Sequence, residues 1–380
     1  MSAAPPAAGN GPRPLCYRPA MRNGMALALI AAVLAGTAAA AEMPLRLAAN
    51  PDPLRAASLP FDPVVAAVPV AGEWRFEIAA AYANLWQGTW QTSAIHAELN
   101  RWREPIGSDE LRELERRYPD SEMYRIDLEA WRTDLVLQRG FANGLALTVQ
   151  IPWLDVGRPH WDGVGEWWHA HLGLPNADRD LFPRGETFLY AKGRDGIIEE
   201  RRQLAGSGVG DIAVSLGVRL GELGGASHRL VASVEAPTGD AGTLLGSGGW
   251  DLGVRYFADW RWRTGALLVG AGYTRLDPAG ALLGRERADT WHAYAGCEQA
   301  LGRGWKAAAS FTLESSPLAD FTSTALGGPA AFLRFGLAHD LGSASWLALD
   351  MGQDWYNVGV SPDYAFRLTF GTGARPLPGR

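Results

Sequence analysis

The side chains best suited to chemistry gather in one polar and aromatic segment, residues 155–207. The candidate binding residues in it are His160, Asp162, Trp168, His169, His171, Arg179 and Asp180. Three histidines with nearby carboxylates can ligate a metal ion. However, His169 and His171 stand two residues apart, so on a helix they diverge. We therefore expect no metal site, and interpret the segment as an amphipathic loop helix with Arg179 paired to an acid.

A second group of ionisable residues recurs at alternate positions of segments with a two-residue apolar period. Asp211 and Asp251 share their phase with Arg219 and Arg255, which predicts a ladder of ion pairs on one polar face. The candidates for this face are Arg75, Glu77, Asp211, Arg219, Asp251, Arg255, Lys306, Arg334 and Arg367.

Nucleophilic catalysis has weak support in the sequence. Ser227-His228 falls at an expected short turn, and neither His292 nor His339 has a serine at a matching strand phase. The glycine-rich stretch 206–211 lacks the Lys-Ser/Thr and the helix of a phosphate-binding loop. We expect no catalytic residues, no cofactor and no enzyme. A lipid-modifying hydrolase that uses His169 or His292 is kept as the alternative.

The elements that position these residues are strands, because apolar residues alternate with polar or small ones from residue 73 onward. The clearest case is 211–220, in which Ile212, Val214 and Leu216 alternate with small or polar neighbours. Twelve such strands are predicted: 73–86, 122–138, 141–154, 208–221, 227–237, 248–262, 264–275, 289–301, 304–315, 329–341, 345–355 and 363–371.

Each predicted strand has one apolar face, which either packs in a soluble sandwich or meets lipid in a membrane barrel. The non-apolar positions are often Gly, Ala or Ser, which suit a crowded barrel interior. The strands approach the ~9–11 residues that cross a bilayer. Aromatic residues recur at strand ends, where an interfacial girdle lies; these are Trp74, Trp86, Trp153, Trp250, Trp260, Trp262, Trp291, Trp305, Trp346 and Tyr364. We therefore predict an all-β fold, a single antiparallel transmembrane β-barrel of about twelve strands.

Connection lengths support the barrel independently. Short links alternate with long ones at 87–121, 155–207, 238–247, 276–288, 316–328 and 356–362. Short periplasmic turns and long outer loops are the rule in such barrels, which predicts both termini in the periplasm. Within the first long loop, Ser108–Arg117 reads as a short capped helix, and 90–100 is assigned to the loop.

Composition excludes several other classes of protein. The chain of 380 residues carries a net charge of −6, and its basic residues do not cluster, which excludes a nucleic-acid binder. With 16 Trp, 12 Phe and 10 Tyr it has ample apolar surface to bury, so it is not a disordered chain. Of its two cysteines, Cys16 lies in the expected leader, so only Cys297 remains after export. A single cysteine excludes an intramolecular disulfide and cysteine metal sites.

The N-terminal region reads as an export signal. Arg22 precedes a short apolar run from Met25, which ends in small residues before Ala41. We expect a leader at 1–41, cleaved after Ala40 or Ala41, with Met21 as the preferred initiator over Met1. The remaining boundaries are a periplasmic segment or plug at 42–70, the barrel at 71–371 and a tail at 372–380. These features predict the outer membrane of a Gram-negative bacterium, with lipid and the barrel-assembly machinery as partners.

Several motifs occur in an order that resembles a known family. They are Pro44–Asn50 before Pro53-Leu54, the 168–180 stretch around Gly-Leu-Pro, Gly208–Asp211, Pro237–Asp240 and Gly246–Gly253. Together they resemble a domain-of-unknown-function family of Gram-negative outer-membrane barrels, and are similar to the outer-membrane channels encoded with phenol meta-cleavage pathways. The resemblance implies a fold and a location but no substrate. One departure is that Phe370 is followed by a tail, where such barrels often end on an aromatic residue.

The function expected from these observations is a passive, porin-like channel or a binding barrel for a small, hydrophobic molecule. Twelve strands lie between filled eight-stranded barrels and wide sixteen-stranded pores, so any pore is narrow. The 42–70 segment and the long loop are the two candidates for closing it. A structural or surface barrel without transport is the third hypothesis, beside the hydrolase.

Overall fold

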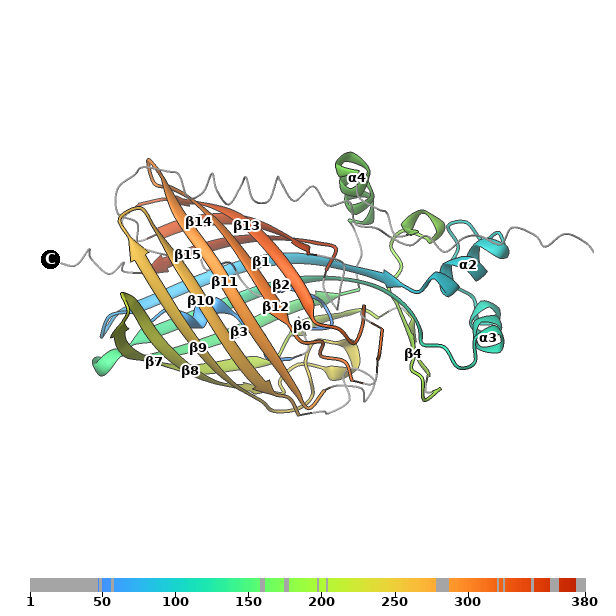
Figure 1. Ribbon diagram of the computed structural model, residues 1–380, viewed down its shortest axis with the longest axis horizontal. Helices are drawn as coiled ribbons and strands as arrows, with labels where there is room; N and C mark the ends of the chain where they lie inside the picture. The colour runs from blue at the N-terminus through green and yellow to red at the C-terminus, as the bar shows by residue number, and fades with distance from the viewer. Residues whose placement is uncertain are drawn as a thin grey trace, which may run out of the picture.

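The computed structural model describes residues 47, 50–55, 58–157, 161–173, 178–196, 198–202, 204–277, 287–319, 321–323, 325–342, 345–355 and 362–373. One antiparallel barrel dominates the molecule, with small helices and short strands beyond one of its ends (Figure 1). The leader at 1–41 and the tail beyond Gly373 lie outside the described residues.

Twelve strands close the barrel, as the sequence predicts. They are β1 (Trp74–Gly88), β2 (Met123–Gly140), β3 (Leu145–Val156), β7 (Ile212–Leu223), β8 (Ala226–Ala236), β9 (Asp251–Trp262), β10 (Gly265–Arg275), β11 (Asp289–Gly302), β12 (Trp305–Glu314), β13 (Ala330–Asp340), β14 (Ser345–Asp354) and β15 (Tyr364–Gly373). Closure occurs where β1 pairs antiparallel with β15, from Arg75 opposite Gly373 to Asn84 opposite Tyr364. The last strand thus runs two residues past the predicted barrel boundary.

The two ends of the barrel differ in their connections. At one end, which we call the short-turn end, tight links join β2–β3, β7–β8, β9–β10, β11–β12 and β13–β14. At the long-loop end, the links between β1 and β2 and between β3 and β7 are by far the longest. In the β7–β8 turn, Gly224 and Gly225 both adopt positive φ, which favours glycine.

The long loops contain most of the remaining structure. The first holds α2 (Trp90–Glu98) and α3 (Ser108–Arg117). The α3 bounds are those predicted, and α2 lies in the segment 90–100 that the sequence assigns to this loop. The second holds α4 (Asp162–Leu172), the 3-10 turn η3 (Arg179–Leu181), and the strands β4 (Phe188–Lys192), β5 (Ile198–Arg202) and β6 (Gly206–Val209), which the sequence analysis missed. No helix among the described residues is long and apolar enough to cross a membrane.

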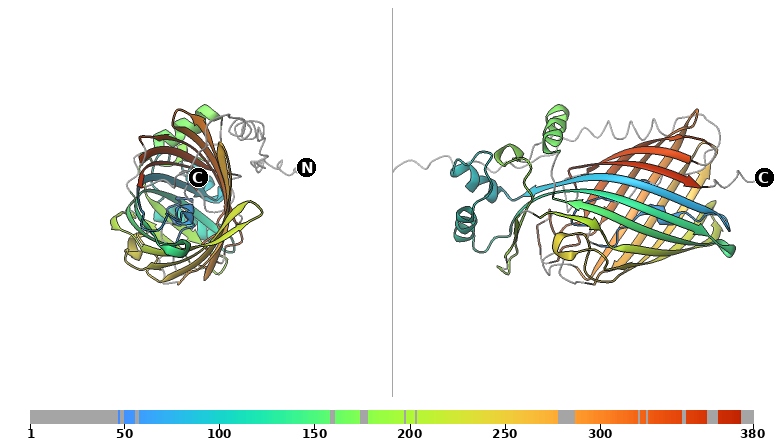
Figure 2. Two further views of the ribbon diagram at one scale, coloured as in Figure 1. Left: turned by 90° about the vertical axis from the view of Figure 1, so that its left-hand side faces the viewer. Right: turned by 180° about the vertical axis from the view of Figure 1, so that it is seen from behind.

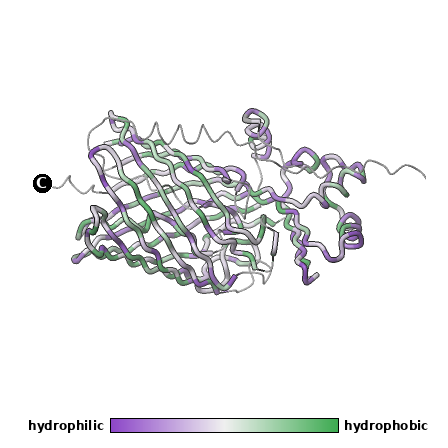
Figure 3. The backbone as a smooth tube through the Cα atoms, viewed as in Figure 1, coloured by the Kyte–Doolittle hydropathy of each residue, from purple (hydrophilic) through white to green (hydrophobic). Residues whose placement is uncertain are grey.

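Strands β4 and β5 exist because β2 is longer than the barrel wall. The first part of β2 projects beyond the barrel, and β4 pairs there with its residues Met123–Asp127 while β5 pairs with β4. This small extension supports the helices at the long-loop end (Figure 1). Purple, hydrophilic residues predominate in the helices, whereas green and purple alternate along the barrel strands (Figure 3).

The outer face of the barrel is apolar between two bands of tryptophan. Exposed Leu, Val and Phe side chains cover its middle, including Leu135, Val214, Leu216, Leu252, Phe311, Leu337, Leu349 and Leu368. Exposed tryptophans at the short-turn end are Trp74, Trp260, Trp262 and Trp305, and those at the long-loop end are Trp153, Trp250 and Trp291. The girdle prediction is wrong for Trp86, Trp346 and Tyr364, which are buried.

Candidate functional site

The centre of the barrel is filled by the chain that precedes β1. We call its described residues between 47 and 68 the plug. Phe61, Val64 and Val65 pack in one cluster with residues of the wall, among them Val231 and Phe257. Viewed along the barrel, the plug is the blue segment inside the ring of strands (Figure 2). The sequence left two roles open for 42–70, a periplasmic segment or a plug. The described residues of this segment occupy the lumen, which is the position of a plug.

The plug enters and leaves the lumen at the short-turn end. Leu47 packs against Ala338 and Trp346, which lie at that end of β13 and β14. The chain then reaches the long-loop end, where Arg55 contacts Glu314 at the end of β12. It returns along other strands and leads directly into β1. The plug is therefore a loop inserted into the barrel, and its middle approaches the long-loop end.

Hydrogen bonds between plug and wall are few, and most involve the backbone of the plug. The Leu59 N–H donates to Asp251 Oδ2 at 3.0 Å. Gln138 Nε2 donates to the Val64 carbonyl oxygen at 3.1 Å. At the outer turn, Arg55 Nη1 lies 3.0 Å from Glu314 Oε2. None of the described plug residues belongs to a strand of the sheet, so side-chain packing and hydrogen bonds from the plug backbone to wall side chains hold the plug in place.

The space left beside the plug is small and charged. A cavity of about 30 Å³ lies between plug and wall, which suits a few water molecules. Its lining residues are Asn50, Pro51, Asp52, Arg55, Pro60, Asp62, Ala81, Arg132, Asp134, Gln150, Arg334 and Arg367. A volume of this size does not admit a benzene-sized solute beside the described residues of the plug.

The structure places most of the candidate lumen residues inside the barrel. Those buried are Glu77, Asp211, Asp251, Arg255, Lys306, Arg334 and Arg367. Arg75 is half-buried, whereas Arg219 is exposed. The ion pairs they form are Arg75–Glu77, Arg367–Glu77, Lys306–Asp340 and Arg334–Asp350.

The predicted ion-pair ladder joining Asp211, Asp251, Arg219 and Arg255 is wrong. Asp211 instead accepts hydrogen bonds from the backbone of Gly239 and Ser247 in the next outer loop. Asp251 accepts from backbone N–H groups of the plug and of residue 277. Phase alone misled because the cross-strand neighbours carry the same charge or none: Arg229 lies opposite Arg219, Glu235 opposite Asp251 and Val231 opposite Arg255. The two aspartates therefore anchor loops.

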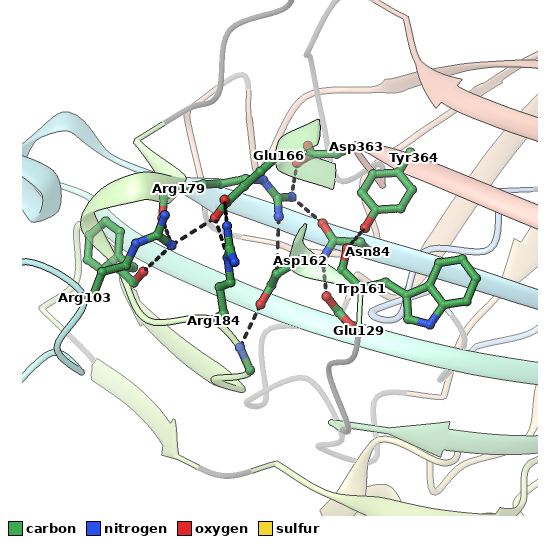
Figure 4. Close-up of polar contacts among 12 residues, drawn as sticks. Asn84, Arg103, Glu129, Trp161, Asp162, Glu166, Arg179, Arg184, Asp363 and Tyr364 are labelled. Atoms are coloured by element: carbon green, nitrogen blue, oxygen red, sulfur yellow. Dashed lines mark hydrogen bonds and ion pairs between the residues drawn. The ribbon is translucent and has the colours of Figure 1, made fainter. Parts of the chain in front are cut away.

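A buried polar cluster joins the second long loop to the barrel mouth, with Arg179 at its centre. Arg179 Nη2 donates to Asn84 on β1 and to Asp363 just before β15, and Nη1 lies 3.4 Å from Asp162 Oδ1 (Figure 4). Its guanidinium also lies 4.6 Å from the ring of Trp86. Burial alone would lower the pKa of Arg179, but the Asp363 carboxylate raises it above its ordinary value. The expectation that Arg179 pairs with an acid is confirmed.

Other contacts fix the start of α4 on the same sector of the barrel. The Tyr364 hydroxyl donates to the Trp161 carbonyl oxygen at 2.9 Å, and Asp162 Oδ2 accepts from the Gly185 N–H at 2.8 Å. Gly165 lies so close to Tyr364 that a β-carbon would come within 2.6 Å of the ring. The helix is thus held by β15 and by its own loop.

A second, more exposed contact lies on the outer side of α4. Glu166 pairs with Arg103 from the first long loop and with Arg184 (Figure 4). Partial burial alone would raise the pKa of Glu166, but hydrogen bonds from Arg184 and Arg103 lower it to about 2. The pair therefore ties the two long loops together with a carboxylate that stays charged at neutral pH.

The remaining loop candidates do not converge on one another. His169 is buried, whereas His171 is exposed and bonds the Trp167 carbonyl through Nδ1 at 2.8 Å. Trp168 is half-buried and Asp180 is exposed; His160 lies outside the described residues. Within the described part of the chain, no group of three or more ligand-type side chains is arranged to hold a metal ion.

The other histidines considered for hydrolysis are also separated. His228 lies at the short-turn end and bonds the Leu223 carbonyl oxygen, and His339 lies against Trp305 with ring centroids 4.5 Å apart. His292 faces the lumen, where Nε2 is 3.2 Å from the Thr290 hydroxyl.

The sequence analysis missed a cluster of buried apolar side chains at the long-loop end of the barrel. Leu54 of the plug packs with residues of β1, β2, β4 and three outer loops; the cluster is Leu54, Leu85, Tyr124, Ile126, Leu128, Leu189, Ala191, Leu204, Leu244, Leu318, Phe321 and Leu326. No single-strand pattern reveals it, because its members come from seven separate segments.

Comparison with solved structures finds barrels of similar architecture at very low sequence identity. The COG4313 outer membrane channel from Pseudomonas putida F1 is 11% identical, with a TM-score of 0.46, over 81% of this chain and 97% of that one. The CymD monoaromatic hydrocarbon channel is 9% identical (TM-score 0.35, 81% and 89% covered), and the P. putida toluene transporter TodX is 7% identical (0.35, 83% and 92%). No curated protein matches the sequence. Residues 115–373, however, match the family described as protein of unknown function (DUF3187), and the chain belongs to that family.

Proposed function

We propose that this protein is an outer-membrane channel for a small molecule, and that the plug closes it in the state described here. The apolar outer face between two tryptophan bands fits lipid, and the charged inner face fits an aqueous lumen. One observation carries the proposal: the plug fills the lumen but contributes no strand to the sheet. The barrel can therefore keep its hydrogen-bonded wall while the plug moves.

Tethering the plug tests this directly. A β-carbon at Gly336 would lie 2.8 Å from Leu47 Cδ2, so cysteines at 47 and 336 face each other, and loss of free thiol on oxidation verifies that the disulfide forms. The double variant is made in a Cys297→Ser background, purified in detergent and inserted into planar lipid bilayers. We expect the oxidised protein to be closed and the reduced protein to conduct.

The controls distinguish conduction through the barrel from gating by the plug. Each single-cysteine variant should conduct equally with and without reductant. If neither the reduced double variant nor the wild type conducts or passes solute, the channel hypothesis is wrong. If the oxidised form conducts as well as the reduced form, the plug is not the gate.

A further inference from the structure

Phe61 of the plug occupies an aromatic pocket on the inner wall. Its ring centroid lies 5.4 Å from that of Phe257, 5.5 Å from His292 and 6.1 Å from Tyr294, and the His292 ring is stacked on it. Phe257, His292 and Tyr294 are at least nine-tenths buried. The pocket thus surrounds one benzene-sized ring with aromatic neighbours from two strands, β9 and β11.

Two glycines of β10 form the floor of this pocket. A β-carbon at Gly270 would lie 3.2 Å from Phe61 Cζ, and one at Gly272 would lie 3.1 Å from Phe61 Cδ2. Both distances are too short for an ordinary side-chain contact, so only glycine lets the ring approach the wall this closely. The β-carbon position of Gly272 is also 3.0 Å from Arg255 Cγ, which places the arginine stem beside the ring.

Arg255 supplies a buried cation at the edge of the pocket. Its Nη2 donates to the Pro60 carbonyl oxygen at 2.6 Å and its Nη1 to the Ser233 hydroxyl at 2.5 Å. Arg255 Nε has no partner among the described residues, and no described carboxylate forms an ion pair with this guanidinium. The acids whose charges act on it are Asp62, from the plug, and Glu235.

His292 adds a second polar atom without a partner. Its Nδ1 accepts and donates no hydrogen bond among the described residues, although the side chain is buried. It lines a second cavity of about 10 Å³ together with Phe61, which leaves room for about one water molecule. A buried polar atom without a partner carries a free-energy cost that a ligand can relieve.

From this geometry we infer that the wall pocket is a binding site for a small aromatic carboxylate. In the closed state the plug occupies this pocket with groups that resemble those of the ligand. Residues 60–62 present a carbonyl oxygen to Arg255, a benzene ring to the aromatic pocket and a carboxylate nearby. An aromatic acid offers the same ring and oxygen acceptor in one molecule, and its carboxylate pairs with a guanidinium more strongly than a carbonyl does. The inference rests on the proposed channel, since the ligand reaches the site only when the plug withdraws.

Emptying the pocket tests binding without relying on conductance. Phe61→Ala removes the ring from the otherwise intact full-length protein and leaves space for a ligand ring. Benzoate is titrated against the variant in detergent by calorimetry and by thermal unfolding. We expect benzoate to raise the Tm of Phe61→Ala more than that of the wild type. Acetate, which lacks the ring, should have no such effect, and toluene should bind without requiring Arg255.

The charge is tested by a second substitution. In the Phe61→Ala background, Arg255→Gln should lower the affinity for benzoate on the order of tenfold or more, because a hydrogen-bonded ion pair is lost. The affinity for toluene should stay within about twofold, since no charge is involved. Leu54→Ala is the matched control, because it opens space elsewhere in the plug, in a different apolar cluster at the long-loop end.

Each outcome decides the question. Equal responses of Phe61→Ala and Leu54→Ala to benzoate would overturn the inference, as would benzoate binding that does not depend on Arg255. If Phe61→Ala does not assemble, Phe61→Leu replaces it. This variant must then show the same order of affinities for benzoate, toluene and acetate. Benzoate binding without any solute flux would refute the channel and keep the site, whereas flux without benzoate binding would refute the site alone.

Discussion

Arg179 is the residue whose replacement should most clearly loosen the second long loop without unfolding the barrel. Its guanidinium is 2% exposed and contacts Asn84, Asp363 and Asp162. Arg179→Met keeps much of the aliphatic stem but leaves Asp363 and Asp162 without their cation. Breaking a buried, hydrogen-bonded ion pair in this way costs about 3–5 kcal/mol.

This cost should appear as local opening of α4 and η3. Because 1.4 kcal/mol is a factor of ten, the opening equilibrium should rise roughly 100- to 4,000-fold. Hydrogen exchange of the amides in 161–187 measures it, with the amides of β9 and β10 as an internal reference. The reference amides should be unchanged, since the barrel strands exchange through a different and larger opening.

The matched control is Arg184→Met in the same loop. Arg184 is exposed and pairs with Glu166, so its loss should cost about 0–1 kcal/mol and change exchange less than about sixfold. If Arg179→Met behaves like Arg184→Met, or if the barrel strands lose protection equally, then Arg179 is not the anchor of this loop.

Three further predictions concern the pH dependence of the Glu166 contact, the seating of the plug and the lipid-facing surface of the barrel. The pKa of Glu166 is depressed to about 2, so its stabilising contribution is present above its unfolded pKa of 4.5 and is lost as pH falls through about 2. The difference in protease sensitivity of 161–187 between the wild type and Glu166→Gln should therefore stay flat from pH 8 to 5, and a difference that shrinks between pH 6 and 5 would contradict this. Leu47→Ala should weaken plug seating by about 2–5 kcal/mol and raise channel open time in bilayers, while the exposed Val70→Ala should not. Leu216→Arg, in the middle of the outer face, should destabilise the barrel by about 2–4 kcal/mol in vesicle unfolding titrations, whereas Leu223→Arg in the turn should cost much less; equal costs would argue against lipid at residue 216.

The strands were predictable because their signal is local. Alternation such as that from Ile212 to Leu216 reports which face is apolar, and twelve repetitions specify a barrel. The helix Ser108–Arg117 was predictable for the same reason, since its capping and charge pattern lie within ten residues. In contrast, α2 has little amphipathic pattern, and β4 is a strand only because the overhang of β2 is available to pair with it.

The candidate site was predictable only in its residue types. The sequence indicates that Arg179 requires an acid, but Asp363 lies 184 positions away and meets it only after the barrel closes. The same holds for Phe61 and Arg255, whose proximity depends on how the plug is seated. Trp86 and Trp346 show the converse: strand-end tryptophan suggests an interfacial girdle, yet both pack inward where the fold offers a pocket.

The seam between β1 and β15 has a consequence for biogenesis. The inserted segment runs directly into the first strand, while the strand that completes the cylinder is the last to be synthesised. Once that seam zips, the polypeptide that fills the centre can no longer enter sideways, and one of the two mouths is covered by loops. A segment that is still outside when the seam forms must therefore enter through the short-turn end, which is the same route that the proposed withdrawal of the plug requires.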